Sequence, residues 1–283
     1  HGIPVEGKDA FTARCDIVTQ PEALRDADVL IVAVKHYDTE AALARLSGLR
    51  IKSAFSVQNG VLKNRQLADV FGPEAVLGSI SMVGGDVLPP DGDRPGAARY
   101  SVAGPTVIGE PSGGESARVQ SLVAAFEHAG LKAQASPDIT SAEWSKFVAW
   151  SGFSTVAVMT RQPTWRFMSD PDTALIAARV MRETANVAIK HGVKLQDSGF
   201  SSQAFINGSE ADAVKAAQAY GEKMHANAPG FRQSILQDAD RNRRLEVHET
   251  LDYTLTLAQQ LGVATPTLDL CCRVLRVVSR AAG

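Results

Sequence analysis

A single lysine stands in a stretch of sequence that is otherwise suited to a protein core. Residues 143–152 read EWSKFVAWSG, and on a helix that turns about 100° per residue Lys146 shares one stripe with Trp150 and Phe153. The opposite side is also apolar, so the pattern predicts a helix that is buried nearly all round. An ammonium group on such a helix either reaches past its neighbours to water or donates a proton to an oxygen that gains negative charge.

Two further polar residues directly follow runs that are typical of strands. Lys35 comes after VLIVAV (29–34), and Asn59 comes after FSVQ (55–58). If the two strands are parallel, both side chains emerge at the carboxyl edge of the sheet, where open α/β sheets bind ligands. Each residue also has an ordinary interpretation, because lysines are usually solvated and asparagine is common in turns before glycine.

Several other site chemistries find no support in the sequence. It contains no Walker loop, no HExxH and no GxSxG motif, which argues against hydrolases and metalloenzymes. The histidines never come at metal-ligand spacing, so we predict no metal site and expect each histidine at a helix end or on the surface; they are residues 1, 36, 128, 191, 225 and 248. The 3 cysteines are too few for a disulfide framework, and a reducing cytoplasm fits best.

Composition and charge disfavour large charged partners. The 283 residues are 45% hydrophobic and 21% charged, which is a globular composition with room for two domains. With 29 basic and 31 acidic residues the net charge is -2, and the basic run RNRR (241–244) lies among acids as a solvated helix end, so we expect no nucleic-acid partner. VLIVAV is far shorter than the roughly 20 residues that cross a bilayer, so we expect no membrane partner either.

The elements that must position these residues fall into two groups. From about residue 10 to 136, strand-like runs alternate with helical patterns, which predicts βαβ units and a parallel sheet. VLIVAV, apolar without alternation, predicts a strand covered on both faces. We expect strands at RCDIVT (14–19), VLIVAV (29–34), SAFSVQ (53–58), AVLGSISMV (75–83), ARYSVAG (98–104) and PTVIGEP (105–111), and helices at 41–46 and 117–130.

From about residue 138 the sequence has helical period throughout. Thr140 or Ser141 is placed to cap the EWSKFV helix, and further helices are expected at 173–192, 213–226 and 246–262. The fold class is therefore an α/β, Rossmann-like domain over residues 1–137 followed by an all-α domain over 138–283. Such a pair commonly binds a nucleotide cofactor on the first domain and a substrate where the two meet.

Five motifs in register resemble the ketopantoate reductase family (2-dehydropantoate 2-reductases), and the resemblance covers nearly the whole chain. It implies an N-terminal Rossmann domain that binds NADP(H) and a helical domain that supplies the substrate site. It also implies hydride transfer from the nicotinamide to the 2-keto carbon of ketopantoate or a related branched 2-keto acid, as in pantothenate synthesis. The motifs are DVLIVAVKHYDTEAAL, FSVQNGV, EWSKF, PGFRQSILQDADRNRRLEVHE and LGVATPT.

The resemblance assigns roles position by position. Lys146 matches the family's catalytic lysine, which would stabilise the developing alkoxide and donate its proton. Glu246 matches a carboxylate that orients the substrate hydroxyl or assists the lysine, close to the cofactor. Asn59 matches a residue near both nicotinamide and substrate, Lys35 one beside the cofactor, and Ser234 one that hydrogen-bonds the substrate. Without the resemblance, Ser234 is a plausible helix cap and Glu246 an exposed helix acid.

The sequence departs from the family where substrate-side asparagines are expected. Trp150 and Ser154 hold the positions four and eight residues after Lys146, and we assign both to substrate binding; Thr164 and Phe231 replace two further asparagines. A pocket that exchanges amides for tryptophan and phenylalanine is more apolar and differently shaped. We therefore expect a different or bulkier 2-keto acid than ketopantoate.

No GxGxxG opens the chain, because HGIPVEGKDAFT corresponds to family sequence beyond the second strand. We expect one more strand–helix–strand unit of about 30 or more residues upstream, without which VLIVAV lacks a neighbour. The preference for NADP(H) thus rests on the resemblance alone. Alternative functions are another hydroxyacid or opine-type dehydrogenase, or a non-catalytic binding or dimerisation relative that lacks a cofactor. A homodimer is a reasonable assembly in each case.

Overall fold

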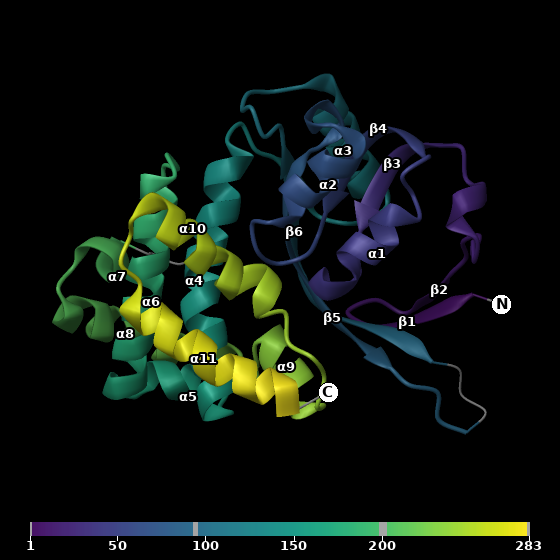
Figure 1. Cartoon of the computed structure of the whole chain (residues 1–283). Helices are drawn as coiled ribbons and strands as arrows, with labels where there is room; N and C mark the ends of the chain where they lie inside the picture. Colours follow the sequence, from purple (N-terminus) through teal and green to yellow (C-terminus); the bar gives the residue numbers. More distant parts are fainter. Residues whose placement is uncertain (1, 93–95, 198–202, 282–283) are drawn as a thin grey trace. The chain divides into compact units, whose positions relative to one another are not determined.

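The chain forms two compact units in the computed structural model, which describes residues 2–92, 96–197 and 203–281. Unit 1 comprises the chain up to Val34, Asp38–Gln58 and Lys63–Ile139, and unit 2 comprises Lys35–Tyr37, Asn59–Leu62 and the chain from Thr140. Figure 1 labels most of the helices and strands of both units. Two short loop segments from the N-terminal half are therefore grouped with the helical residues.

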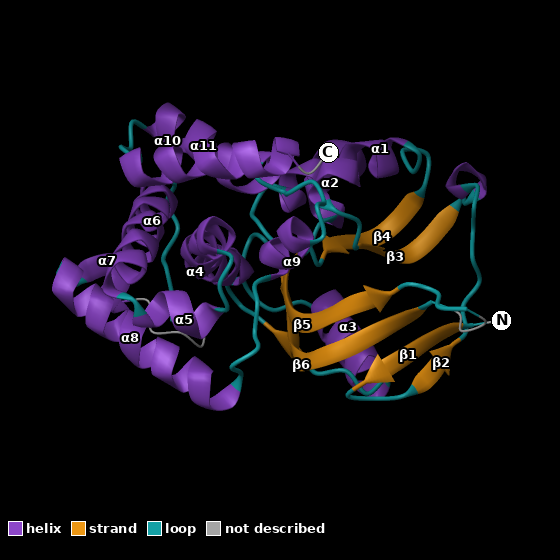
Figure 2. Ribbon diagram, turned by 90° about the horizontal axis from the view of Figure 1, so that it is seen from below, coloured by secondary structure: helices purple, strands orange, loops and turns teal. Residues whose placement is uncertain are grey.

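The strands of unit 1 form two sheets (Figure 2). They are β1 (Ile3–Gly7), β2 (Phe11–Ala13), β3 (Asp26–Val32), β4 (Arg50–Ser56), β5 (Gly78–Leu88), β6 (Ala97–Gly109) and β7 (Ala133–Ala135). The larger sheet has the order β2–β1–β6–β5 with β7 beside β6, and the smaller pairs β3 with β4 in parallel. Because β5 runs antiparallel to β6 while β1 and β7 run parallel to it, the larger sheet is mixed. The prediction of a parallel sheet is therefore wrong for this sheet.

Helices cover both faces of β4. Its Ala54 packs with Leu43 of α1 (Thr39–Ala44) and Leu67 of α2 (Lys63–Phe71). The next residue, Phe55, points to the other face and packs with Val119 of α3 (Ala117–His128), as the period of two in a strand requires. The unit is thus Rossmann-like, with helices on both faces of its strands, as the sequence predicted.

The neighbouring strand β3 is less covered than its sequence predicts. Val32 is buried, whereas Ile31 on the opposite face is 46% exposed and Val34 is 40% exposed. Within the described residues β3 pairs on one side only, with β4. The prediction of a strand covered on both faces is therefore wrong for VLIVAV. The strand that helices cover on both faces is β4, with which it pairs.

Two strand predictions need correction. RCDIVT (14–19) has no regular structure, and Ile17 is 77% exposed, because strand-forming residue types need a neighbouring strand that this segment does not have. ARYSVAG and PTVIGEP are one continuous strand, β6, and not two. Gly104 fits there because β5 shifts register opposite it, and a Cβ at position 104 would lie 2.4 Å from the Met82 carbonyl oxygen.

Unit 2 is helical, as predicted. The helices are α4 (Ile139–Thr160), α5 (Thr164–Ser169), α6 (Pro171–Lys190), α7 (Gln203–Asn207), α8 (Glu210–Asn227), α9 (Ser234–Asp240), a π-helix (His248–Asp252), α10 (Tyr253–Leu261) and α11 (Pro266–Ala281). Thr140 and Ser141 lie inside α4 and do not cap it. The segment 246–262 is not one helix, because a turn and the π-helix precede α10. Among the described residues no helix is long and apolar enough to cross a membrane.

Helix α4 is buried nearly all round, which confirms the sequence prediction. One side contributes Trp144, Phe147 and Trp150 to a cluster with α10 and α11. The other side contributes Val148 and Phe153 to a second cluster, with α6 and α8. The helix that carries Lys146 is therefore held by two cores at once.

Helix α4 lies close against α6 at Gly152, where a Cβ would lie 2.7 Å from the Ala177 carbonyl oxygen and 2.6 Å from Met181 Cγ. We predict that Gly152→Ala lowers the free energy of unfolding by about 1–3 kcal/mol, because overpacking outweighs the higher helix propensity of alanine. Urea unfolding measures the difference. The control is Gly48→Ala, where a Cβ would meet nothing within 4 Å and a change within about 0.5 kcal/mol is expected. Equal stability of the two variants contradicts this close crossing.

Candidate functional site

The loops that follow β3 and β4 begin at the same edge of the smaller sheet. Val32 lies opposite Ser56 in a parallel register, which confirms that the two strands run in the same direction. The Gln58 side chain joins the loops, because its Nε2 donates to the Val34 carbonyl oxygen at 2.6 Å and to Thr39 Oγ1 at 2.8 Å. The two chain segments that continue, Lys35–Tyr37 and Asn59–Leu62, belong to unit 2.

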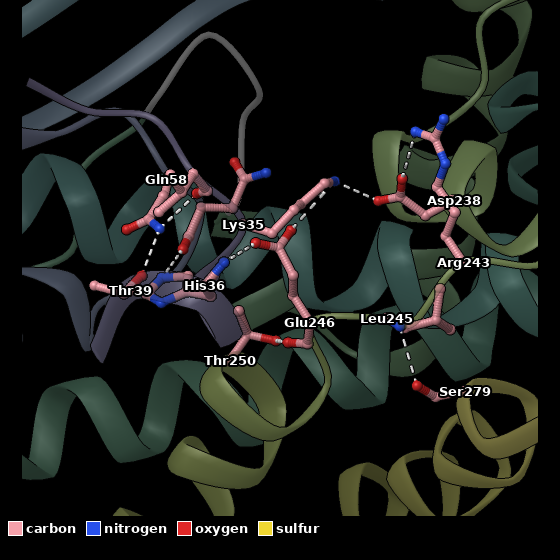
Figure 3. Close-up of polar contacts among 12 residues, drawn as sticks. Lys35, His36, Thr39, Gln58, Asp238, Arg243, Leu245, Glu246, Thr250 and Ser279 are labelled. Carbon is pink, nitrogen blue, oxygen red and sulfur yellow. Dashed lines mark hydrogen bonds and ion pairs between the residues drawn. The ribbon is translucent and has the colours of Figure 1, made fainter. Parts of the chain in front are cut away.

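Lys35 lies between two carboxylates (Figure 3). Its ammonium group donates a hydrogen bond to Asp238, and Glu246 Oε2 is 3.8 Å from its Nζ. Burial acts to lower the pKa of Lys35, but the bond to Asp238 and the charge of Glu246 outweigh it and leave the pKa above its ordinary value. Lys35 is thus a paired cation and not merely a solvated lysine after a strand.

Glu246 is buried, with only 9% of its surface exposed, so the interpretation as an exposed helix acid is wrong. It lies in a turn before the π-helix, and its Oε1 accepts the His36 backbone N–H at 2.7 Å. Burial raises the pKa of the Glu246 carboxyl above its ordinary value; the nearby charge of Asp238 adds to this, while the His36 N–H and Lys35 act against it. The carboxyl group therefore stays protonated to higher pH than an ordinary glutamate.

His36 is a structural link that the sequence did not reveal. It is the first residue of a short 3-10 helix (His36–Asp38), which agrees with the helix-end alternative of the prediction, but it is buried, with 1% of its surface exposed. The ring Nε2 lies 2.7 Å from the Asn59 carbonyl oxygen, and the backbone N–H holds Glu246. The segment that begins at Lys35 thereby holds the turn that begins at Asn59.

Lys146 meets Asn59 directly. Its Nζ donates to Asn59 Oδ1 at 3.2 Å, and its side chain is half-buried. Gly60 completes the turn with φ +88, and a Cβ there would lie 3.0 Å from Thr250 Cγ2 of the π-helix, so the turn is closely packed. Asn59 is thus both a turn residue, as its sequence neighbours suggest, and a hydrogen-bond acceptor for the half-buried Lys146.

The stripe of α4 that carries Lys146 continues with Trp150 and Ser154. These residues are 8% and 0% exposed, and Trp150 stacks on Phe147 with ring centroids 5.7 Å apart. Neither Trp150 Nε1 nor Ser154 Oγ has a hydrogen-bond partner among the described residues. Two buried polar atoms therefore lie on the same helical face as the lysine.

Ser234 joins the site only indirectly. It is exposed at the first position of α9, where Gln233 is the N-cap, so it does not cap the helix. Asp238, the partner of Lys35, lies one turn later on the same helix. Thr164 and Phe231 come together through a backbone hydrogen bond, N–H to carbonyl oxygen at 3.1 Å.

The structure thus connects four of the predicted residues, Lys146, Asn59, Glu246 and Lys35, through short contacts. Asp238 was missed, because in the sequence it is one of several acids around RNRR. Its position four residues after Ser234, on the same helical face, is the signal that could have found it. Within residues 2–92, 96–197 and 203–281 no group of three or more His, Cys, Asp or Glu could hold a metal ion.

Comparisons with known proteins agree on one family. A family model described as "Ketopantoate reductase PanE/ApbA C terminal" matches residues 138–279, and one described as "Ketopantoate reductase PanE/ApbA" matches residues 1–113. A 2-dehydropantoate 2-reductase of Halobacterium salinarum is 25% identical over 283 residues, which cover 99% of this chain and 86% of the relative.

Solved structures show the same fold. A dimeric ketopantoate reductase from Staphylococcus aureus has a TM-score of 0.74 at 19% identity, with coverage of 100% of this chain and 88% of that one. A D-mandelate dehydrogenase in a ternary structure with NADH and anilino(oxo)acetate has a TM-score of 0.80 at 16% identity, with coverage of 100% and 86%. At sequence identities of 19% and 16%, the similarity to these two structures shows a shared fold and nothing further.

The environment of Glu246 leads to two opposite predictions. Asp238→Asn removes the negative charge that raises the pKa of Glu246, while the positive charge of Lys35, which lowers it, remains. The pKa of Glu246 should therefore fall. Lys35→Met removes the positive charge, so this pKa should rise above its already raised value. A carbon-13 NMR titration of glutamate carboxyl groups, assigned with Glu246→Gln, measures both shifts. Lys190→Met, at the exposed end of α6, should change nothing, and shifts of equal sign in the two test variants contradict the described geometry.

Proposed function

Because the chain belongs to the ketopantoate reductase family, we propose that it reduces ketopantoate or a related branched 2-keto acid with NADPH. Family membership makes it an oxidoreductase that acts on a small molecule. The observation that carries the finer proposal is the 3.2 Å hydrogen bond between Lys146 Nζ and Asn59 Oδ1. The resemblance assigns proton donation to Lys146 and a place near nicotinamide and substrate to Asn59, and this hydrogen bond joins the two residues.

Lys146 is the proposed general acid. Reduction of a ketone places negative charge on the carbonyl oxygen, and an ammonium group directed at that oxygen stabilises the charge and donates a proton. Asn59 keeps the ammonium group oriented. Because Lys146 is half-buried, its effect on a developing charge is larger than it would be in water.

Glu246 is proposed to orient the substrate hydroxyl or to assist Lys146, beside the cofactor. Its pKa is raised by burial, so it keeps its proton to higher pH than an ordinary glutamate. A protonated carboxyl group donates one hydrogen bond and still accepts another. That combination suits contact with a hydroxyl group, which also both donates and accepts.

The nucleotide cofactor is proposed to bind at the carboxyl ends of β3 and β4, where Lys35 and Asn59 follow the strands. The parallel pairing of these strands fits this assignment, because open α/β sheets bind nucleotides at that edge. When bound, the cofactor supplies the hydride. Since Asp238 already pairs with Lys35, we propose that Lys35 positions the site and does not act as a lone cation for phosphate.

We keep NADP(H) as the proposed nucleotide, with residues 1–137 as the cofactor domain and 138–283 as the substrate domain. The D-mandelate dehydrogenase of similar fold is in a structure with NADH, so both nucleotides belong in any assay.

We also propose a homodimer, because a ketopantoate reductase of similar fold from S. aureus is dimeric.

The substrate is proposed to be bulkier or more apolar than ketopantoate. Trp150 and Ser154 stand where the resemblance places amides, and Trp150 is fixed by its stack on Phe147. The indole N–H and the Ser154 hydroxyl are buried without a partner among the described residues, and we propose that they bind polar atoms of the substrate. The anilino(oxo)acetate in the D-mandelate dehydrogenase structure has an aromatic group of the kind that such a site would accept.

The substrate proposal predicts the outcome of an oxidation assay with NADPH and NADH. Across ketopantoate and 2-keto acids with larger aliphatic or aromatic side chains, kcat/KM for the best bulkier acid should exceed that for ketopantoate by about tenfold or more, because a lost amide hydrogen bond weakens a polar ligand by about 1–3 kcal/mol. A clear preference for ketopantoate contradicts this. If no acid is reduced and neither nucleotide shifts the melting temperature of the full-length protein, a non-catalytic relative is favoured.

Replacement of the proposed acid tests the mechanism. Lys146→Ala should lower kcat by about 10²–10⁴-fold, which is the usual contribution of a positioned general acid, while the melting-temperature shift with nucleotide is retained. Lys190→Ala, at the exposed end of α6, is the matched control and should keep full activity. If Lys146→Ala retains turnover within about tenfold of the wild type, another group donates the proton.

A further inference from the structure

Lys63 is a buried cation outside the residues to which the proposed reaction assigns a role. It is the first residue of α2, and only 2% of its surface is exposed. Its ammonium group donates to the carbonyl oxygens of Ser56 and Gln58, each at 3.1 Å, and to that of Ser79. An ammonium group has three donors, and a buried charge is costly unless it is hydrogen-bonded. The three carbonyl oxygens therefore determine where this ammonium group lies.

One interpretation of Lys63 is a structural link between two strands, because Ser56 ends β4 and Ser79 lies in β5. Another hydrogen bond already joins these two serines, since Ser79 Oγ donates to the Ser56 carbonyl oxygen at 2.8 Å. That bond does not replace the contact of Lys63 with Gln58, which is the residue before Asn59. The contact with Gln58 is therefore the one that calls for a further explanation.

The two peptide groups on either side of the Asn59 Cα are each held by a buried side chain. Lys63 donates to the oxygen of the first group, the Gln58 carbonyl, and His36 Nε2 lies 2.7 Å from the oxygen of the second, the Asn59 carbonyl. Because peptide groups are planar, their two orientations set φ and ψ of Asn59 and with them the direction in which its side chain leaves the backbone. That side chain accepts the hydrogen bond from Lys146 at 3.2 Å.

We propose that Lys63 is a positioning residue for the reduction. Through the Gln58 carbonyl oxygen it orients Asn59, and Asn59 orients the ammonium group of Lys146. This inference rests on the proposed function, because Lys63 takes its effect from the proposed general acid. A displacement of about 1 Å can lower the rate of a positioned reaction by about 10²-fold, so a small rotation of the peptide group before Asn59 is sufficient to change turnover.

Replacement of Lys63 tests its effect on turnover. Lys63→Met should lower kcat by about tenfold to 10²-fold, because Asn59 loses one of its two supports, while KM for the nucleotide and the melting-temperature shift with nucleotide stay near the wild-type values. Ser79→Ala is the matched control, since it removes a fully buried hydroxyl group that contacts Ser56 and not Gln58. It should lower the melting temperature but keep kcat within about twofold. An equal loss of kcat in the two variants overturns the proposal.

A double-mutant cycle tests the route through Asn59. Asn59→Ala alone should lower kcat, and adding Lys63→Met should lower it by no more than about twofold further, because the side chain that Lys63 orients is already absent. If the two losses multiply in the double variant, Lys63 does not act through Asn59.

Nitrogen-15 labelling of asparagine gives a measurement that does not need turnover. The side-chain amide signal of Asn59, assigned with Asn59→Ala, should shift in Lys63→Met and stay in place in Ser79→Ala. If the wild type reduces no keto acid, the proposed function fails, while this signal still reports whether Lys63 orients Asn59. Lys63→Gln, which keeps two N–H donors on a shorter side chain, is the second variant and should show the same changes to a smaller extent. An unmoved Asn59 signal, or loss of folding in both Lys63 variants, makes Lys63 a structural residue and overturns the proposal.

Discussion

The partial burial of one ammonium group is the constraint on which the rest of the site depends. Lys146 lies on a helix with apolar neighbours on every side, and a charged group in such surroundings needs a hydrogen-bond acceptor. Asn59 Oδ1 provides one at 3.2 Å. An amide oxygen orients an ammonium group without cancelling its charge, whereas a carboxylate does both. Lys35, bonded to Asp238, illustrates the second case, with its pKa raised by the pairing against the effect of burial.

The position of that amide depends in turn on residues far apart in the sequence. His36 Nε2 contacts the Asn59 carbonyl oxygen, and Glu246 holds the His36 backbone N–H. Gly60 allows the turn to lie against Thr250 of the π-helix, since any Cβ would come within 3.0 Å of its methyl group. The π-helix forms the start of what the sequence pattern describes as one regular helix, and π-helical turns are frequent at functional sites.

Sequence periodicity predicted the elements that are governed by local pattern, and it failed where contacts distant in sequence decide. Helices α3, α6 and α8 follow from apolar spacing and end signals in their own residues. The segment 14–19 has strand-forming residues but no neighbouring strand, and no local pattern reveals such a lack. The contacts of His36 and Glu246 with one another span 210 positions, so neither burial was visible in their neighbours. Lys146, Asn59 and Lys35 stood out because each is polar beside an apolar run.

Helix α4 explains how the proposed catalytic group and the proposed substrate wall can vary independently. On the side away from Lys146 it packs against α6 at Gly152, where the Ala177 carbonyl oxygen and the Met181 side chain leave no room for a Cβ. Trp150 and Ser154 follow Lys146 at intervals of one turn along the same rigid helix. Side chains at these two positions can therefore change the size and polarity of their surroundings while the helix axis, and with it the ammonium group, stays where the two cores hold it. A loop could not separate the two properties in this way, because a bulky side chain at one position would displace its neighbours.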